Sequence, residues 1–570
     1  MNINSLTSYY HFPLSLFTST MKNFILFFVL FTLTSPLYGA AVVLETVKDE
    51  QGRDRFETRY KMTPMPLAQP YLKYSLYWDY ADRLSGNAAF YYELAYSEMV
   101  RTELRKTNDN ARNLLAKIWD KAAEDPPVNQ VFLVENTIPF VGMNSKYETE
   151  KSNFTSGFYM NIYSYQYYHE NFESHLDDAK KFVEQYAEVF QLLERGSRCE
   201  FYDLGISYRE SSFIPNAVYS PVQHVRDLTR VLQIKILLEI YEGRYEDAVK
   251  SARIGMEMAK HIGDQPTLVC PLVGIAIHGI MHAALMELLD RPDAPNLYWA
   301  VTNRPNPYFH FAQSAQAEKA MLNQMFPLLK KATDDPNTLS GEEWKLFCRQ
   351  ADQMIQEMSD DETASEESHP AISVETAYPG AREWLKQQGK TDEEIDAMSK
   401  ENVVGLQAVH DIQFVWGDQY NAVYLPIWER LHDPEKDEPF YYRKSLAHLS
   451  PYARMLGGQF VPALDAGRQA FRRVQLQNDT LRISQALRIY MAEHDGKLPE
   501  KLEEIKSVPV PCVDPYTGKP FRYRLENGVG IIEIPEHVYP LTVYFEPVRS
   551  TKNSSQFSQK PTSRRSACLL

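Results

Sequence analysis

Two histidines stand at a spacing that could bind a metal ion. In His278-Gly-Ile-Met-His282 the imidazoles are four residues apart, so a helix would place both on one face, where they could bind a single zinc ion. The metalloprotease pattern requires a glutamate directly after the first histidine as general base, and Gly279 stands there instead. No third ligand is evident, so we predict no metal and no other cofactor. The alternative to a zinc site is that His278 and His282 are buried and hydrogen-bonded.

An amide and two aromatic side chains form a second candidate site, at Asn296, Tyr298 and Trp299. An amide beside aromatic rings can stack against a sugar or a peptide and bind it by hydrogen bonds. Large aromatic residues near helix ends also pack into protein cores, so the alternative is that Tyr298 and Trp299 cap a bundle of helices. Packing is the favoured interpretation, and ligand binding at these three residues is kept as a candidate.

Other catalytic patterns are missing from the sequence. It contains no Gly-rich phosphate loop, no G-x-S-x-G elbow and no cysteine-centred nucleophile motif, so no catalytic residue is assigned. The five cysteines are far apart and form no C-x-x-C spacing, which argues against a metal cluster and against a disulfide framework. Asn153-Phe-Thr and Asn478-Asp-Thr match the N-glycosylation pattern, which has meaning only in a eukaryotic secretory route.

The composition is that of an acidic globular protein. Of the 570 residues, 44% are hydrophobic and 12% aromatic, which is enough for large buried cores. The formal net charge of -15 disfavours a nucleic-acid partner, because binding a phosphate backbone depends on clustered Lys and Arg. We expect the partner to be a protein, a peptide or a component of the cell envelope.

The N-terminus carries an export signal over residues 1–41. Lys22 is followed by the apolar run Phe24–Leu33 and by the small residues Gly39-Ala-Ala41, which is the order of a secretory signal peptide. The apolar run is shorter than the about 20 residues that cross a bilayer, which favours cleavage over a permanent anchor. We expect translation to start at Met21 and the protein to be periplasmic or extracellular. An uncleaved signal would anchor it and would be its one contact with the membrane.

Three consecutive helices predicted over residues 227–289 form the centre of the expected fold. The first carries apolar side chains around most of its circumference, so it should be covered on several sides. The third, Leu268–Leu289, is also apolar nearly all round, and its Pro271 and Glu287 favour a buried central helix over a membrane span. The second has a stripe with small residues that allows close helix packing, formed by Ala248, Ala252, Gly255, Ala259 and Ile262.

The rest of the chain divides around that centre into a mainly α fold. Residues 42–358 are predicted to form a helical domain that starts with a strand or extended arm and a Pro-rich linker. An acidic linker (359–370), a second helical segment (371–470) and a small α+β module (471–549) follow, and the tail (550–570) is predicted to be disordered. The module should contain an antiparallel hairpin at Asn527-Gly528. Further helices are predicted for residues 87–99, 111–123, 176–194 and 472–493, and a capping box opens a short helix at Thr391.

One turn resembles a known helical repeat. Gly243-Arg-Tyr245-Glu-Asp-Ala248 is similar to the turn and second-helix start of a tetratricopeptide repeat, in which the glycine loosens the turn and the small alanine packs against the first helix. One good copy is present. The resemblance therefore implies one tetratricopeptide-like hairpin within 227–289, as part of a multi-helix array rather than a regular repeat domain.

A broader resemblance runs from about Gly86 to Glu536. Pro295-Asn-Leu-Tyr-Trp-Ala300, Ala492-Glu-His-Asp-Gly-Lys-Leu-Pro499 and Val510-Pro-Cys-Val-Asp-Pro-Tyr-Thr-Gly-Lys-Pro-Phe521 look like parts of a family of uncharacterised exported proteins from planctomycete bacteria. That family implies export and no particular activity. The final module also resembles the C-terminal half of type II secretion pseudopilins. The calcium-binding loop and membrane helix of that family are missing, so neither calcium nor a pilus-forming role is carried over.

Three functions remain in view, of which one, a structural subunit of an envelope assembly, is suggested only by the pseudopilin-like module. The first is an exported, non-catalytic helical protein that binds or scaffolds a peptide, a protein or a cell-envelope component. The alternative is an extracytoplasmic hydrolase whose active site is assembled from distant residues in a cleft between helices. A shallow groove of mixed polarity would favour the first, and a deep pocket with converging titratable groups would favour the second.

Overall fold

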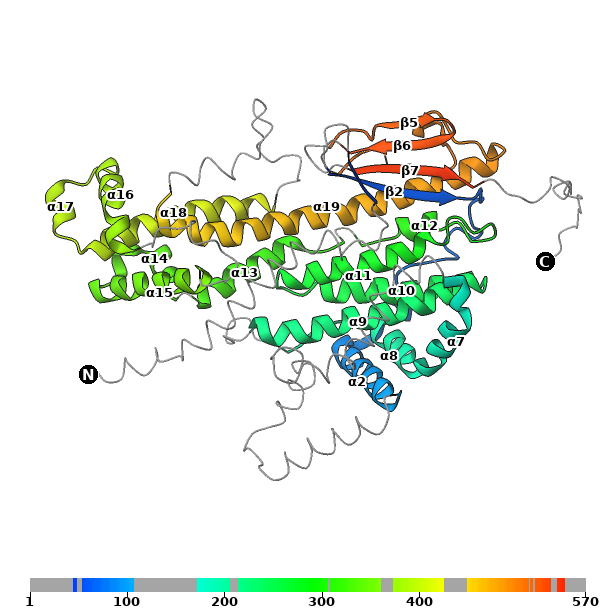
Figure 1. Cartoon of the computed structure of the whole chain (residues 1–570), viewed down its shortest axis with the longest axis horizontal. Coiled ribbons are helices and arrows are strands. Elements are labelled where there is room, and N and C mark those ends of the chain that lie inside the picture. The colour runs from blue at the N-terminus through cyan, green and yellow to red at the C-terminus, as the bar shows by residue number, and fades with distance from the viewer. Residues whose placement is uncertain are drawn as a thin grey trace, which may run out of the picture.

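The computed structural model describes residues 45–48, 54–106, 172–205, 214–305, 308–325, 327–359, 373–424, 449–511, 513–515, 518–534 and 541–548. The predicted signal peptide, the acidic linker beyond residue 359, the C-terminal tail and the helix predicted at 111–123 lie outside these residues. Over the described part the protein is mainly helical, with a small mixed sheet at one end of an elongated molecule (Figure 1).

Three helices form a central group, which we call the hub. They are α9 (Ile214–Tyr241), α10 (Tyr245–Gly263) and α11 (Val269–Met286). α9 begins before the predicted residue 227 and continues through Pro221. Gly243 takes a φ of +74° in the turn to α10, a conformation that glycine adopts without steric cost. α11 is the one described helix long and apolar enough to cross a membrane, and it is mostly buried inside the protein.

The small residues of α10 allow α11 to pack closely, as their spacing predicts. All five residues of the stripe from Ala248 to Ile262 are buried. The closest approach is between Gly263 and Gly274. A Cβ atom added at Gly274 would lie 2.7 Å from the carbonyl oxygen of Ala259 and 2.8 Å from the Cα of Gly263. The backbones of α10 and α11 therefore meet with no room for a side chain.

Gly274→Ala is expected to destabilise the protein by roughly 1–3 kcal/mol, because the added methyl meets backbone atoms that cannot rotate away. Urea unfolding followed by circular dichroism measures the change. The matched control is Gly380→Ala in α16 (Val374–Gln387), where an added Cβ meets nothing within 4 Å. That variant should be neutral or slightly more stable, since alanine favours the helix. Equal stability of the two variants would mean that the close approach is not real.

Short helices cover the hub on the α9 side. They are α2 (Ala88–Lys106), η4 (Phe172–His175), α7 (Leu176–Gln185) and α8 (Ala187–Ser197), with strands β3 (Leu84–Asn87) and β4 (Cys199–Phe201) beside them. The single helix predicted for 176–194 is wrong in one respect, since it is interrupted at Tyr186. Gly196 does not end α8 as expected. It lets α8 pack against α2, since a Cβ there would lie 2.6 Å from the ring of Tyr92.

A second group of helices lies at the opposite end from the sheet (Figure 1). In the chain it is preceded by α12 (Tyr298–Thr302) and α13 (Phe311–Met325). The group itself contains α14 (Pro327–Asp334), η5 (Pro336–Thr338), α15 (Gly341–Ser359), α16, α17 (Asp392–Asp396) and α18 (Lys400–Ala422). These helices share their own core around Trp344, whose ring packs against Gly405 of α18. The capping box predicted at Thr391 is confirmed, since its side chain and that of Glu394 bond each other's backbone amides.

One long helix joins the two ends of the molecule. α19 runs from Pro451 to Glu493 beside α18 and continues past α11 to the sheet (Figure 1). The sequence predicted a helix only from residue 472, and α19 crosses residue 470 without a break. Its first turn is capped by Ser450, whose backbone amide donates to the buried carboxylate of Asp411 on α18 at 2.7 Å. An anion at a helix N-terminus is favoured by the helix dipole.

The sheet is mixed, because a strand from each end of the chain pairs in parallel. Its order is β1 (Glu45–Lys48), β2 (Asp54–Met62), β7 (Leu541–Pro547), β6 (Val529–Glu533) and β5 (Tyr523–Glu526). β5 and β6 pair antiparallel around Asn527-Gly528, where both residues have positive φ. β2 pairs parallel with β7, so the arm expected near residues 41–60 forms part of the C-terminal sheet. Alternate residues of β2 face inward, with Tyr60 and Met62 buried.

Candidate functional site

The histidine pair lies in the protein interior. His278 and His282 on α11 are both fully buried. The Nδ2 of Asn478 donates to Nε2 of His278 at 3.2 Å, and Nε2 of His282 lies 3.1 Å from the hydroxyl of Tyr60. Each Nε2 atom is thus hydrogen-bonded to a different partner. Among the described residues no group of three or more His, Cys, Asp or Glu side chains is placed to hold a metal ion.

The hydrogen bonds around His282 define which groups donate. The hydroxyl of Thr480 on α19 donates to the carbonyl of Leu476 at 2.9 Å, so it accepts from the hydroxyl of Tyr60, 2.8 Å away. Tyr60 then accepts from Nε2–H of His282. The chain of bonds joins α11, β2 and α19. Asn478 is also buried, so its N-glycosylation pattern is closed to modification in the folded protein.

Burial lowers the pKa values of three histidines. The pKa of His278 falls to about 4 and that of His282 to about 3, because the charged imidazolium would lose its hydration. His261 on α10 behaves alike, with a pKa of about 3 caused first by burial. Its Nε2–H donates to the carbonyl of Cys199 at 3.0 Å, and its Nδ1 accepts from the hydroxyl of Tyr92 at 2.8 Å. All three are neutral structural residues at neutral pH.

The second predicted site, Asn296, Tyr298 and Trp299, is divided between the interior and the surface. Asn296 is buried, and its Nδ2 donates to the carbonyl of Gln485 at 2.9 Å while its Oδ1 accepts from the amide of Tyr298 at 3.0 Å. Tyr298 is fully buried and donates to the carbonyl of Pro509. Trp299 is partly exposed. These contacts favour the alternative in which the aromatic residues cap the helix bundle.

Arg488 of α19 is a buried arginine that the sequence analysis missed. Its Nε donates to the carbonyl of Thr63 at 2.9 Å, its Nη2 to Ala294 at 2.9 Å and its Nη1 to Pro295 at 3.2 Å. The side chain has no exposed surface. The signal in the sequence is its spacing, since it stands seven residues after Leu481 on the apolar face of the helix. The hydrogen bonds of Arg488 hold the start of residues 63–83 and the loop before α12 against α19.

Residues 63–83, called the strap here, cross the hub along α10 and carry the best candidate surface. The strap begins where β2 ends and includes the Pro-rich linker expected from the sequence and the short helix η3 (Tyr80–Asp82). It is fixed at Lys73, which forms an ion pair with Glu246 at 2.6 Å, and at the carbonyl of Ser75, which accepts from Nε of Arg253 at 2.9 Å. Its own Leu76 and Tyr77 are buried.

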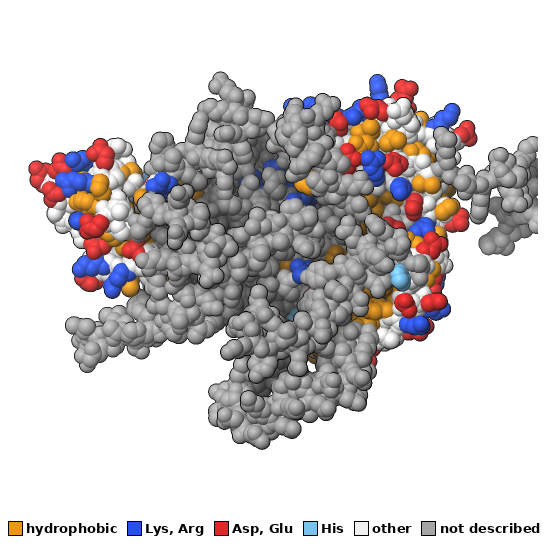
Figure 2. Space-filling view, viewed as in Figure 1, with side chains coloured by type: hydrophobic (Ala, Val, Ile, Leu, Met, Phe, Trp, Pro, Cys, Tyr) orange, Lys and Arg blue, Asp and Glu red, His pale blue; other side chains and the backbone are white. Residues whose placement is uncertain are grey.

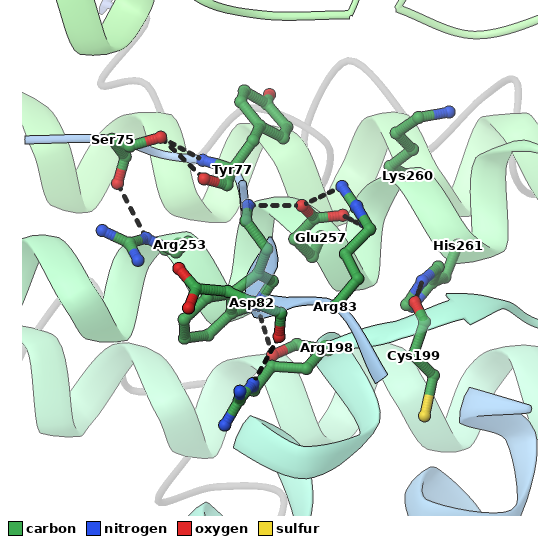
Figure 3. Close-up of polar contacts among 12 residues, drawn as sticks. Ser75, Tyr77, Asp82, Arg83, Arg198, Cys199, Arg253, Glu257, Lys260 and His261 are labelled. Carbon is green, nitrogen blue, oxygen red and sulfur yellow. Dashed lines mark hydrogen bonds and ion pairs between the residues drawn. The ribbon is translucent and has the colours of Figure 1, made fainter. Parts of the chain in front are cut away.

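A buried carboxylate anchors the far end of the strap (Figure 3). Glu257 of α10 has a side chain only 1% exposed, and its Oε1 accepts from the backbone amide of Trp78 and from Nη2 of Arg83, each at 2.8 Å. Burial raises the pKa of Glu257, and the guanidinium of Arg83 opposes that rise. Arg83 therefore neutralises the buried carboxylate and the amide of Trp78 donates to it, which fixes the position of the backbone between these two strap residues.

Two further arginines flank Trp78. The guanidinium carbon of Arg253 lies 4.7 Å from the centre of the Trp78 ring, and that of Arg198 lies 5.4 Å from it. The indole nitrogen donates to the hydroxyl of Ser197 at 3.0 Å, and Nε of Arg198 donates to the carbonyl of Asp82 at 2.8 Å. In the view of Figure 3, Arg253 lies to the left of Glu257 and Arg198 below it, with Asp82 between the two arginines.

The outer side of the strap exposes large apolar side chains. Tyr71 is 55% exposed, Leu72 is 69% exposed and Tyr80 is 90% exposed. Tyr71 also lies 6.4 Å, centre to centre, from the ring of Trp299. Figure 2 shows acidic and basic side chains interspersed at both ends of the molecule, as on an ordinary solvated surface. Exposed aromatics on a fixed segment are by contrast a feature of binding surfaces.

Comparison of the chain with protein-family models, with curated proteins and with solved structures finds no match.

Proposed function

We propose that the protein is an exported, non-catalytic binding protein that holds a peptide or protein partner against the strap. The observation that carries this proposal is that the strap exposes Tyr71, Leu72 and Tyr80 while buried polar contacts at Glu257 and Arg488 fix its backbone. Such preorganisation lowers the entropy cost of association. The three side chains are large and amphipathic or apolar, which suits contact with another protein.

The proposal keeps the features that the sequence resemblances imply. The signal peptide over 1–41 and the resemblance to exported planctomycete proteins support a periplasmic or extracellular location. The α9–α10 pair, with its glycine turn and buried Ala248, supports a tetratricopeptide-like hairpin. In this protein α2, α7 and α8 pack against α9 and α10, so the partner surface is proposed on the strap and not on the hub helices themselves. The β5–β6 hairpin supports a pseudopilin-like module.

The alternative, an extracytoplasmic hydrolase, would need titratable groups free to act on a substrate. Two buried titratable residues beside the strap with shifted pKa values are Glu257 and His261. Glu257 is occupied by Trp78 and Arg83, and His261 by Tyr92 and Cys199. Their hydrogen bonds fit a structural role better than general acid or base catalysis, which supports the binding proposal.

Affinity capture with matched variants tests the proposal. The triple variant Tyr71→Ser, Leu72→Ser, Tyr80→Ser should recover a specific partner from the exported fraction about tenfold less than the wild type, since each lost side chain contributes to a contact surface. The control replaces exposed apolar residues elsewhere, Phe90→Ser, Leu94→Ser and Phe201→Ser, which are 67%, 44% and 50% exposed. Quantitative mass spectrometry gives the recoveries. Equal recovery by the wild type and the strap variant would rule the strap out.

A further inference from the structure

Arg198 and Arg253 leave most of their hydrogen-bonding capacity unused. Each donates through Nε to a backbone carbonyl, Asp82 for Arg198 and Ser75 for Arg253. In the part of the chain that the structure describes, the terminal nitrogens of both have no hydrogen-bond acceptor and no carboxylate within 4.0 Å. The neighbouring cations Arg83 and Lys260 are, by contrast, paired with Glu257 and Asp264. Both guanidiniums are thus held through Nε, while their terminal nitrogens have no hydrogen-bond partner among the described residues.

The surroundings of the two guanidiniums orient them and partly bury them. Burial lowers the pKa of Arg253, because its guanidinium loses hydration. The charges of Asp79, Asp82 and Glu257 oppose that shift. The Trp78 ring restrains both guanidiniums, because cations are attracted to its face. A bound carboxylate would accept charge-assisted hydrogen bonds from guanidinium groups that are already oriented.

From this geometry we propose that Arg198, Trp78 and Arg253 form a receptor for glutamate or aspartate side chains of an acidic peptide. The inference rests on the proposed function, since it names the chemical class of the partner that the strap binds. Tyr80, next in the chain to Asp79, supplies an apolar contact for residues between the acidic ones. Asp79 and Asp82 disfavour a densely charged polyphosphate, which they would repel, and a peptide with spaced carboxylates avoids that repulsion.

Fluorescence anisotropy with two matched peptides tests the receptor. The probes are a fluorescein-labelled peptide of alternating Glu and Tyr and the same peptide with Gln at every Glu position. The full chain should bind the Glu peptide at least about tenfold more tightly than the Gln peptide, since charge-assisted hydrogen bonds are about twice as strong as neutral ones. Added salt should weaken the Glu peptide alone. Equal binding of the two peptides by the wild type would overturn the inference.

Three arginine variants locate the effect. Arg253→Gln and Arg198→Gln should each reduce the preference for the Glu peptide about tenfold, and Arg253→Lys should reduce it in part because the charge stays while the fork is lost. The control is Arg349→Gln, because Arg349 also donates through Nε to a backbone carbonyl, that of Lys345, but is exposed and lies on α15. Arg349→Gln should keep the full preference. A preference retained by both Arg198→Gln and Arg253→Gln, with unchanged circular dichroism, would overturn the inference.

Two outcomes separate this inference from the proposed function. Tight binding of both peptides that is lost in the Tyr71, Leu72, Tyr80 variant would keep the strap as the binding surface while excluding a carboxylate receptor. Displacement of the Glu peptide by inorganic phosphate, at concentrations where acetate has no effect, would assign the arginines to phosphate and contradict the proposed acidic peptide.

Discussion

Arg488→Met is expected to destabilise the protein by about 3–5 kcal/mol, because each buried carbonyl that loses its donor costs roughly 1–3 kcal/mol. Methionine keeps much of the stem of the side chain, so the loss reports on hydrogen bonds more than on volume. The carbonyls concerned belong to Thr63, Ala294 and Pro295, which bring the strap and the loop before α12 onto α19. Urea unfolding followed by circular dichroism measures the difference in the free energy of unfolding.

Two companion variants make the Arg488 result specific. Arg488→Lys should also be destabilising, since one ammonium cannot reach three separate carbonyls in the positions that the guanidinium serves. Arg349→Met, at an exposed arginine of α15, should stay within about 0.5 kcal/mol of the wild type. If Arg488→Met were as stable as Arg349→Met, the strap would not depend on this residue.

Acid should destabilise the protein through its three buried histidines. The unfolded chain binds their protons near pH 6.5, whereas His278 in the folded protein does so only near pH 4 and His282 and His261 only near pH 3. The unfolded state therefore binds more protons as the pH falls below 6.5, and stability is lost in that direction. Each histidine lowers the free energy of unfolding by about 1.4 kcal/mol per pH unit as the pH falls from 6 to the pKa of that histidine in the folded protein. Stability due to neutral histidines is fully present above pH 7.

Buried carboxyl groups act with the opposite sign, so the histidine contribution must be measured as a difference. Burial raises the pKa of Glu318 to about 7, and its protonation in the folded state offsets part of the acid loss. The double variant His278→Asn, His282→Gln removes two of the histidines and leaves Glu318 in place. Its stability relative to the wild type should rise by about 3 kcal/mol per pH unit from pH 6 down to pH 4. A pH-independent difference between the two proteins would contradict neutral, buried imidazoles.

The hub could be predicted because its signals are local. The apolar character of Leu268–Leu289, the small residues of the second helix and the glycine of the turn each depend on neighbours a few positions away. Their consequences are the buried α11, the close packing at Gly263 and Gly274, and the positive φ of Gly243. The interruption at Tyr186 and the passage of α8 through Gly196 were missed. At Gly196, contacts with α2 decide the outcome, and tertiary packing overrides helix propensity.

Strands of the sheet could be predicted from the sequence, but the pairing of β2 with β7 could not. An extended arm before Tyr60 could be predicted from alternation, and the hairpin from Asn527-Gly528. Nothing in either segment indicates that β2 pairs in parallel with β7, because the register joins residues such as Tyr60 and Phe545 that are far apart in the chain. Their stacked rings, 5.4 Å apart, form part of the core only once both ends of the chain are present.

The candidate site was the least predictable part. His278 and His282 drew attention by their types and spacing, yet the structure uses them as hydrogen-bonded core residues. The sequence predicts only a Pro-rich linker in the region of the strap. Its chemistry depends on Arg253 and Arg198, which come from a helix and a turn distant in the sequence and meet at Trp78. Single-residue patterns could not indicate that meeting.

Hydrogen–deuterium exchange of the full chain, alone and with the partner recovered by affinity capture, tests the central claim most directly. We expect the partner to slow exchange in residues 70–83 and in the adjoining turn at Arg198, and to leave α2 around Phe90 and Leu94 unchanged. Slower exchange on α2 with no change in residues 70–83 would contradict the strap as the binding surface.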